Sequence, residues 1–250
     1  MKRWLRFTAA VLAAAFLFAL TGCGSSTNSA SFTWFVDSIP ANLDPQVASG
    51  ASDVIACENL YGTLVRKDPD GELVPGLCEK WTVSPDGLTY TFTLKDSLTY
   101  AAAKGATTEY DITAEDFVFA FRRIFRADTA SPYAVEFSAI QNSAAVQAGL
   151  ADESSLGVSA NGALTLVFRL SERDDNFLAK LALPGAAPCD EAFFESTRGT
   201  YGLTAKTTLA SGSFYLYNWT ANGLFLRRTV ESPLVGSLRL VQDPSGSGKS

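Results

Sequence analysis

Few residues of this chain could carry out chemistry, and one catalytic residue type is missing. The chain has 250 residues and no histidine, which excludes Ser-His-Asp or Cys-His nucleophile activation, His-ligated zinc and a histidine general base. Two carboxylates could still hydrolyse a glycosidic bond. The candidate pair, Asp174 and Asp175, is adjacent in sequence, and no pattern brings two carboxylates together across a cleft. We therefore expect no catalytic site, no metal and no cofactor.

The cysteines are the next residues that could carry out chemistry, as a disulfide or as a reactive thiol. Cys57, Cys78 and Cys189 are odd in number, so at most one disulfide could form among them, and its connectivity is not given by the sequence. A reactive thiol needs a lowered pKa, which a histidine usually provides and which a helix N-terminus or a lysine could also provide. Without histidine, three buried apolar cysteines are the simpler interpretation.

Arg122, Arg123 and Arg126 form a group of cations at the end of a predicted helix. They could bind phosphate, but a solvent-exposed helix end is the simpler interpretation, because the helix dipole favours cations at the C-terminus. The chain as a whole is acidic, with 20 Lys and Arg against 26 Asp and Glu and a net charge of −6. An acidic chain is a poor candidate for nucleic-acid binding, so we expect no nucleic-acid partner.

The first 23 residues have the order of a secretory signal, with Lys2, Arg3 and Arg6 before an apolar run over residues 9–20. The run is shorter than the roughly 20 residues that cross a bilayer. Its ending, Leu-Thr-Gly-Cys at residues 20–23, resembles the bacterial lipobox, which implies that Cys23 is acylated. We expect an extracytoplasmic protein that is lipid-anchored to the bacterial cell membrane through a polar, flexible tether.

Antiparallel strands dominate the rest of the pattern. Four turn dipeptides are each flanked by apolar residues at a period of two, which predicts hairpins at Asp70-Gly71, Asp86-Gly87, Asn161-Gly162 and Asn222-Gly223. The clearest helix covers residues 114–126, where Thr113 and Asp116 can form a capping box. Other helices are predicted over residues 53–64, 175–183 and 190–197.

The order and the residues of seven segments resemble the family 5 extracellular solute-binding proteins, the oligopeptide and dipeptide receptors of ABC importers. These segments are residues 42–45 (Asn-Leu-Asp-Pro), 59–65, 74–81, 84–94, 113–118, 130–134 and 156–160. The resemblance continues to about Arg228. It implies a mixed α/β fold of the type II periplasmic-binding-protein kind, with largely antiparallel sheets and peripheral helices. Members are about twice this length, so we expect the first lobe only, with the second lobe absent.

The resemblance also implies a domain organisation. We expect a signal peptide over residues 1–22, a tether over 23–31, an incomplete core subdomain from 32–61 and 189–230, an inserted subdomain over 62–188 and a divergent polar tail over 231–250.

Ligand-binding residues follow only from the resemblance. Counting forward from the Asn-Leu-Asp-Pro segment implies a backbone edge at Ser49, Gly50 and Ala51, where a glycine permits close approach of a ligand. Tyr133 matches a family tyrosine that reaches the ligand, although an ordinary core aromatic is the alternative. Ser211, Gly212 and Ser213 occupy the place of a segment at the cleft wall, with Ser211 standing where the family has asparagine.

The function implied by the resemblance is capture of short peptides by main-chain hydrogen bonds in a cleft between lobes, and delivery to the permease subunits of an ABC importer. We expect a monomer that is not an enzyme, and a truncated form that binds weakly. Alternatives are a lipid-anchored surface interaction protein, or a binding protein for oligosaccharide or chelated nickel.

Overall fold

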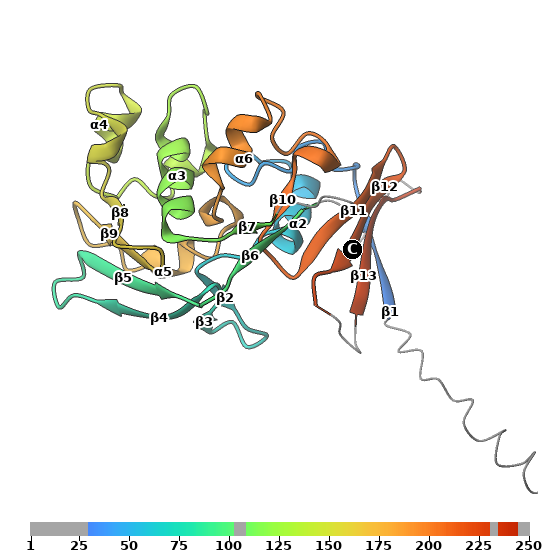
Figure 1. Cartoon of the computed structure of the whole chain (residues 1–250), viewed down its shortest axis with the longest axis horizontal. Helices are drawn as coiled ribbons and strands as arrows, with labels where there is room; N and C mark the ends of the chain where they lie inside the picture. The colour runs from blue at the N-terminus through green and yellow to red at the C-terminus, as the bar shows by residue number, and fades with distance from the viewer. Residues whose placement is uncertain (1–29, 103–108, 231–234, 245–250) are drawn as a thin grey trace, which may run out of the picture.

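The computed structural model describes residues 30–102, 109–230 and 235–244, which form an elongated body with a sheet near each end (Figure 1). The predicted signal peptide, Cys23 and most of the predicted tether lie outside the described residues. Within the described ranges, no helix is long and apolar enough to cross a membrane.

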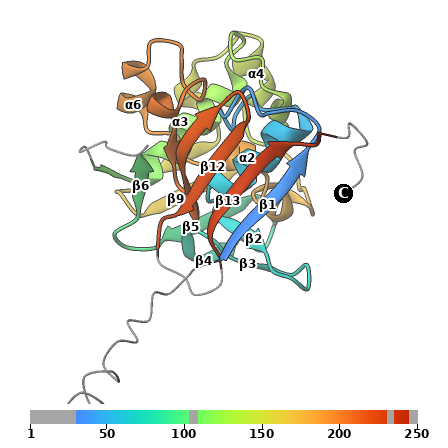
Figure 2. The same ribbon diagram turned by 90° about the vertical axis from the view of Figure 1, so that its right-hand side faces the viewer.

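A four-stranded sheet at one end has the strand order β1-β13-β12-β11 (Figure 2). Its strands are β1 (Ala30–Val36), β13 (Val235–Gln242), β12 (Gly223–Arg228) and β11 (Phe214–Thr220). β1 pairs in parallel with β13, and the other neighbours pair antiparallel. Helix α2 (Ala51–Leu60) packs beside this sheet, where Leu60, Leu216, Leu226 and Leu240 share one hydrophobic cluster.

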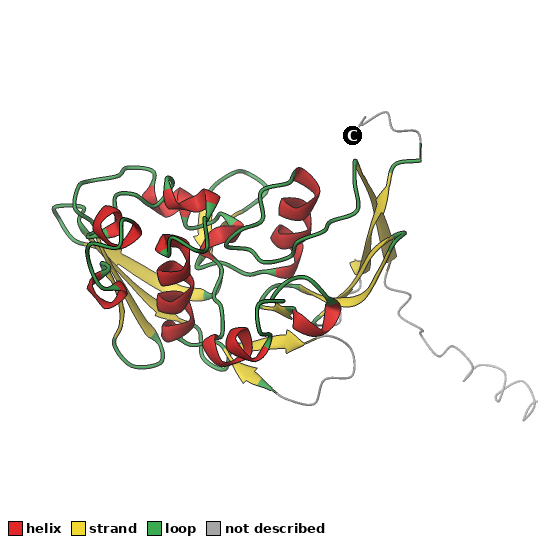
Figure 3. Cartoon of the chain, turned by 90° about the horizontal axis from the view of Figure 1, so that it is seen from above, coloured by secondary structure: helices red, strands yellow, loops and turns green. Residues whose placement is uncertain are grey.

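A second four-stranded sheet, at the other end, is antiparallel throughout and has the order β4-β5-β9-β8. Its strands are β4 (Cys78–Val83), β5 (Thr89–Leu94), β9 (Thr165–Arg169) and β8 (Val158–Ala160). Helix α3 (Ala114–Phe125) lies across one face (Figure 3). The ring centroids of Phe121 on α3 and Phe168 on β9 are 4.9 Å apart. Aromatic packing between helix and sheet therefore forms this core.

Smaller elements connect the two ends. They are the hairpin β2 (Val65–Lys67) with β3 (Leu73–Pro75), the three-stranded set β10 (Leu209–Ala210), β6 (Thr99–Ala102) and β7 (Tyr110–Asp111), and the helices α4 (Ser143–Gln147), α5 (Phe177–Lys180) and α6 (Glu191–Ser196). The change from one main hydrophobic cluster to the other falls between Tyr61 and Leu64 and again between Ala186 and Ala187. Leu209 belongs to the same cluster as Leu64 and Ala186, so the clusters do not divide the chain into two uninterrupted parts. The predicted division into core and inserted subdomains stays a prediction.

Local signals predicted most of these elements. All four turn dipeptides lie at antiparallel connections, and α3 begins at Ala114 with the predicted capping box. The helix predicted over residues 175–183 was too long, because only Phe177–Lys180 is α-helical and Pro184 follows in a short 3-10 turn. Pro184 has no backbone N–H and disfavours helix in the residue before it.

Two predicted segments were wrong in their boundaries. Residues 235–242, assigned to a polar tail, form the strand β13 in the interior of the first sheet, with Leu238 and Leu240 buried. Ala30 and Ser31, assigned to the tether, belong to β1. The pairing between β1 and β13 joins segments about 200 residues apart, so no local sequence pattern predicts it.

The interaction between the two ends of the molecule centres on a buried ion pair. Arg123 of α3 donates from Nη2 to Asp44 Oδ2 at 2.5 Å and from Nη1 to Gln46 Oε1 at 2.6 Å. The side chains of Arg123 and Asp44 are 3% and 8% exposed. Arg123 also lies over the ring of Phe194, with 4.0 Å from Cζ to the centroid.

The expectation of a solvent-exposed arginine group is therefore wrong for Arg123, and its guanidinium is engaged by protein groups rather than by phosphate. Burial alone would lower the pKa of Arg123, but the Asp44 carboxylate beside it raises the pKa above its ordinary value. Burial raises the pKa of the Cys189 thiol to about 12, so the thiol is neutral near pH 7 and Asp44 is the real counter-charge.

We predict that Arg123→Met and Asp44→Asn each destabilise the fold by roughly 3–5 kcal/mol, because each leaves a buried polar or charged partner uncompensated. The double variant should lose less than the sum of the two single losses. Urea unfolding of all four proteins provides the coupling free energy. Additive losses would show that the two side chains do not depend on each other.

The first turn of α3 contains a buried carboxylate. Asp116 is 8% exposed and accepts a hydrogen bond from the Thr113 N–H at 2.9 Å. Burial raises the pKa of Asp116 from 3.8 to about 7, and the neighbouring Asp190 adds to the rise, while the Thr113 hydrogen bond opposes it. The folded state therefore retains a proton on Asp116 that the unfolded chain has released, and this contribution to stability falls as pH rises from about 4 to 7.

We predict that Asp116→Asn, which keeps an acceptor for Thr113, gains stability relative to the native chain by about 2–3 kcal/mol between pH 5 and 8. Chemical denaturation at several pH values measures the difference. Glu79→Gln, an exposed change on β4 whose carboxylate does not act on Asp116, is the control and should show no such trend. A constant difference between Asp116→Asn and the native chain across this range would contradict the assignment.

Candidate functional site

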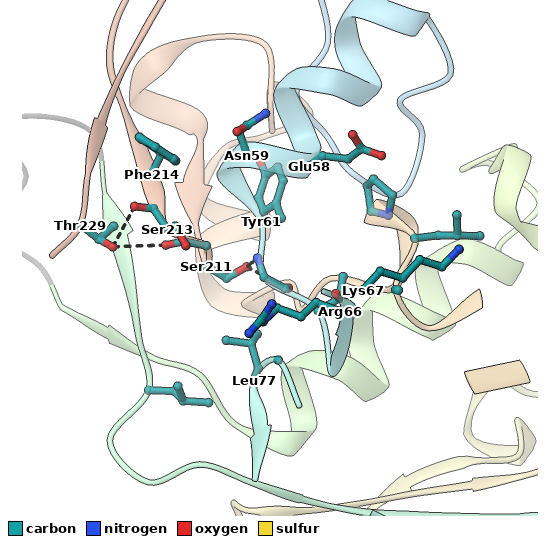
Figure 4. A pocket seen from close by; sticks show the side chains of 18 of the residues that line it. Glu58, Asn59, Tyr61, Arg66, Lys67, Leu77, Ser211, Ser213, Phe214 and Thr229 are labelled. Atoms are coloured by element: carbon teal, nitrogen blue, oxygen red, sulfur yellow. Dashed lines mark hydrogen bonds between the residues drawn. The ribbon is translucent and has the colours of Figure 1, made fainter. Parts of the chain in front are cut away.

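A cleft of about 880 Å³ opens between the end of α2, the β2–β3 hairpin and the segment that leads into β11 (Figure 4). Tyr61, Gly62 and Thr63 line it from the chain just after α2. Ser211, Gly212 and Ser213 line it from the segment before β11, and Leu183 and Pro184 line it from the chain after α5. Residues far apart in sequence thus face one space.

Two glycines allow the backbone walls of the cleft to meet. The Gly212 N–H donates to Leu60 O at 2.8 Å, and the Gly62 N–H donates to Ser211 Oγ at 3.1 Å. A Cβ on Gly62 would lie 2.8 Å from Ser211 O, and one on Gly212 would lie 2.9 Å from the Leu60 carbonyl. Such contacts are too short for a side chain, so glycine is required at both places.

The hydroxyl groups at this wall are engaged in holding it together. Thr229 donates from its backbone N–H to Ser213 O at 2.9 Å, and its side chain lies within hydrogen-bond distance of the Gly212 and Ser213 carbonyls (Figure 4). Ser211 is 7% exposed and accepts from Gly62. Ser211 therefore stabilises the wall, whatever further contact it makes.

Charged side chains also line the cleft. Arg66 and Lys67 extend from β2, and Lys95 lies after β5 with its Nζ 2.5 Å from Gly76 O. Glu58, on the last turn of α2, is the one carboxylate among the lining residues that the structure describes, and burial raises its pKa. Among these described residues, positive groups outnumber negative ones, although the chain as a whole is acidic.

The structure brings only some of the predicted ligand-binding residues to this cleft. Ser211, Gly212 and Ser213 line it. Ser49, Gly50 and Ala51 are exposed at the start of α2, whereas the cleft is lined by the end of that helix. Ligand contact at these six positions stays a prediction.

Tyr133 is 8% exposed and lies in the core rather than among the lining residues. Its hydroxyl donates to Ala48 O at 3.3 Å, immediately before Ser49. Its ring packs on Gly185, where a Cβ would lie 2.4 Å from Tyr133 Cγ. Burial raises the pKa of Tyr133 to about 12, so the hydroxyl stays protonated as a donor. Tyr133 thus supports the predicted backbone edge from behind.

Sequence reasoning missed the charged residues of the cleft, Glu58, Arg66, Lys67 and Lys95. The Asp70-Gly71 turn predicts the strand that carries Arg66 and Lys67, but a strand pattern does not say what lies opposite. The cysteine interpretation is confirmed, because Cys57, Cys78 and Cys189 are buried and unpaired. Within the described residues, no group of three or more His, Cys, Asp or Glu side chains could hold a metal ion.

Comparison with known proteins agrees with this architecture. Residues 72–228 match the family described as bacterial extracellular solute-binding proteins, family 5 Middle. The oligopeptide-binding protein AliA of Streptococcus pneumoniae serotype 4 is 29% identical over 222 residues, which are 88% of this chain and 32% of AliA. The oligopeptide-binding protein SarA of Streptococcus gordonii is 32% identical over 195 residues, which are 76% of this chain and 29% of SarA.

A solved structure shares the fold. The substrate-binding domain of an oligopeptide ABC transporter from Bacillus anthracis str. Ames superposes with a TM-score of 0.77 at 27% identity, over 84% of this chain and 41% of that one. The chain thus spans about a third of the length of these curated relatives. The predicted mixed α/β fold, of the type II periplasmic-binding-protein kind and matching a single lobe, is confirmed. The chain belongs to the family 5 bacterial extracellular solute-binding proteins.

Proposed function

We propose that this chain is the substrate-binding lipoprotein of a peptide ABC importer, which captures short peptides and delivers them to the permease. The observation that carries this proposal is the match of residues 72–228 to the solute-binding family, together with relatives named as oligopeptide-binding proteins. A cleft with glycine-lined backbone walls fits that role, because an extended peptide is recognised through its main chain.

The two carboxylates that could have served a glycosidase, Asp174 and Asp175, are both engaged in ion pairs, which favours binding over catalysis. Asp174 accepts from Lys180 Nζ at 2.7 Å, and Asp175 accepts from Arg173 Nε at 2.6 Å. Each carboxylate is therefore engaged in its own ion pair, and the two do not converge on a shared space. A non-enzymatic receptor that works as a monomer is the proposal that fits.

The ligand-binding residues proposed for this function form two backbone edges. One edge is Ser49, Gly50 and Ala51, which Tyr133 supports through Ala48, and the other is Ser211, Gly212 and Ser213. Main-chain N–H and C=O groups at such edges would bind peptides of many sequences.

We expect these 250 residues by themselves to bind peptides weakly. Glu58, Arg66 and Lys67 are exposed in the cleft, so a ligand lying on them stays partly in water. Loss of even three charge-assisted contacts from an opposing wall would cost roughly 4 kcal/mol or more, which is about a thousandfold in affinity. Ligand enclosure is what tight sites normally provide.

We predict that tri- to pentapeptides shift the amide NMR signals of Gly62 and Gly212 with a dissociation constant on the order of 1 mM. Maltotriose is the control ligand and should leave these signals unchanged. Micromolar binding in calorimetry would contradict the weak-binding proposal. Absence of any shift with 10 mM peptide would contradict peptide binding by this cleft.

We predict that Cys23 is the site of lipid attachment. In a bacterial host, the native chain should incorporate labelled palmitate and partition into detergent, whereas Cys23→Ser should lose both properties. Ser25→Ala, in the same stretch of sequence, serves as the matched control and should behave as the native chain does. Equal labelling of Cys23→Ser and the native chain would exclude this anchor.

A further inference from the structure

The sheet formed by β1, β13, β12 and β11 has one face that no described helix covers. Leu226 and Leu240 point from the other face into the hydrophobic cluster that includes residues of α2. Because side chains alternate along a strand, Phe225 and Arg239, which are paired across β12 and β13, lie on the uncovered face. Figure 2 views the sheet from this side, with α2 behind it.

This uncovered face, here called the open face, carries aromatic and cationic side chains, namely Phe35, Tyr217, Phe225, Arg227 and Arg239. Arg227 Cζ lies 3.7 Å from the ring centroid of Tyr217, and Arg239 Cζ lies 5.7 Å from that of Phe225. Both arginines are exposed, and Phe35 is 57% exposed. The open face therefore presents guanidinium groups stacked beside rings.

The charge of this sheet differs from that of the whole chain. Within the bounds given above, its four strands contain three arginines and no aspartate or glutamate, although the net charge of the chain is −6. None of the ion pairs found among the described residues includes Arg227 or Arg239. A hollow of about 210 Å³ on the open face is lined by both of these arginines. An anionic group on this face would thus meet positive charge without a neighbouring carboxylate in the strands.

The sheet also lies close in sequence to the predicted lipid attachment. β1 begins at Ala30, seven residues after Cys23. Seven residues span at most roughly 25 Å when fully extended. A chain anchored at Cys23 would therefore keep the start of β1 within about 25 Å of the bilayer. Phe32 and Trp34 on this edge strand are 54% and 40% exposed.

We propose that the open face docks on the surface of an anionic phospholipid bilayer, with Arg227 and Arg239 on lipid phosphates. Aromatic rings and arginine side chains favour the membrane interface, because each combines an apolar part with a polar one. An anionic surface repels the acidic remainder of the chain, so the cationic face is the one that turns towards it. The inference rests on the proposed lipid attachment only for the tether that keeps the sheet near the membrane.

The first test compares the full chain, made in a bacterial host, in nanodiscs of phosphatidylcholine with and without about one phosphatidylglycerol in three lipids. Carbene footprinting with mass spectrometry measures labelling of exposed side chains. In the anionic discs we expect labelling of Phe35 and Phe225 to fall about threefold or more, and to recover at high salt. Leu150, which is 83% exposed beside α4 at the other end, should be labelled equally in both discs. Equal labelling of Phe35 in the two discs would overturn the proposal.

Variants then assign the contact to the open face. Arg227→Gln and Arg239→Gln should each lower the ratio of docked to undocked protein, obtained from the labelling of Phe35, about fivefold. The double variant should be labelled as in neutral discs. Arg169→Gln removes an exposed arginine from the second sheet and is the matched control. Thermal melting checks that each variant is folded, and unchanged protection in the folded double variant would overturn the proposal.

Other occupants of the open face give different results. A lipid-free dimer in sedimentation that protects Phe35 as strongly as the anionic discs do would assign the face to a second copy of the chain. Protection by inorganic phosphate in neutral discs would assign it to a soluble anion. Either result would overturn docking on a bilayer.

The anchor and the open face can fail separately. The mass of the N-terminal peptide shows whether Cys23 carries lipid, whereas labelling of Phe35 shows whether the face is docked. Protection of Phe35 in a chain with unmodified Cys23 would support the face and refute the anchor. Lipid on Cys23 without protection of Phe35 would keep the anchor and overturn the face.

Discussion

The structure depends on one buried ion pair, between Asp44 in the turn after β1 and Arg123 in the last turn of α3. A charge removed from water is tolerated only beside an opposite charge with good hydrogen bonds, so this pair fixes where the turn and the helix must meet. Gln46 extends the same network, because its Nε2 donates to Gly185 O and Ala187 O at 3.2 and 3.0 Å. The turn, the helix and the chain before α6 are therefore held as one unit, across the change between the two main hydrophobic clusters.

The cleft follows from this arrangement. Tyr61 donates to Leu43 O at 2.6 Å, which ties the end of α2 to the same turn, and Gly212 then donates to Leu60 O from the other side. Backbone edges consequently form the walls of the cleft, and side chains such as Ser211 and Thr229 serve to hold those edges. A protein built this way has fixed main-chain donors and acceptors and needs few reactive groups, which agrees with a chain that lacks histidine altogether.

Prediction from sequence succeeded where the determining forces are local. The Asp86-Gly87 dipeptide correctly predicted the β4–β5 hairpin, and the Thr113–Asp116 pair correctly predicted the start of α3. Both predictions rest on turn and capping preferences that act over about four residues. It failed for Arg123, whose position in the last turn of α3 equally suits a solvated cation. Prediction also failed for residues 235–242. Polar residues surround Leu238 and Leu240 in the sequence, and this strand forms only through its pairing with β1 on one side and β12 on the other. For the site, the Ser211–Ser213 wall was predicted from a family resemblance, while the charged residues of the same cleft were not predicted.

The sequence by itself determined the fold class, the hairpin connections, the main amphipathic helix and the family, because each depends on short patterns of apolar spacing, turn residues or matching segments. Only the tertiary structure decided that Asp44 and Arg123 share one buried site, that Tyr133 supports a backbone edge from the core, and that Arg66, Lys67 and Lys95 face a common cleft. The physical reason is distance along the chain. Residues separated by tens to hundreds of positions interact through packing and charge that exist only after the chain has closed on itself, and no local preference encodes those partners.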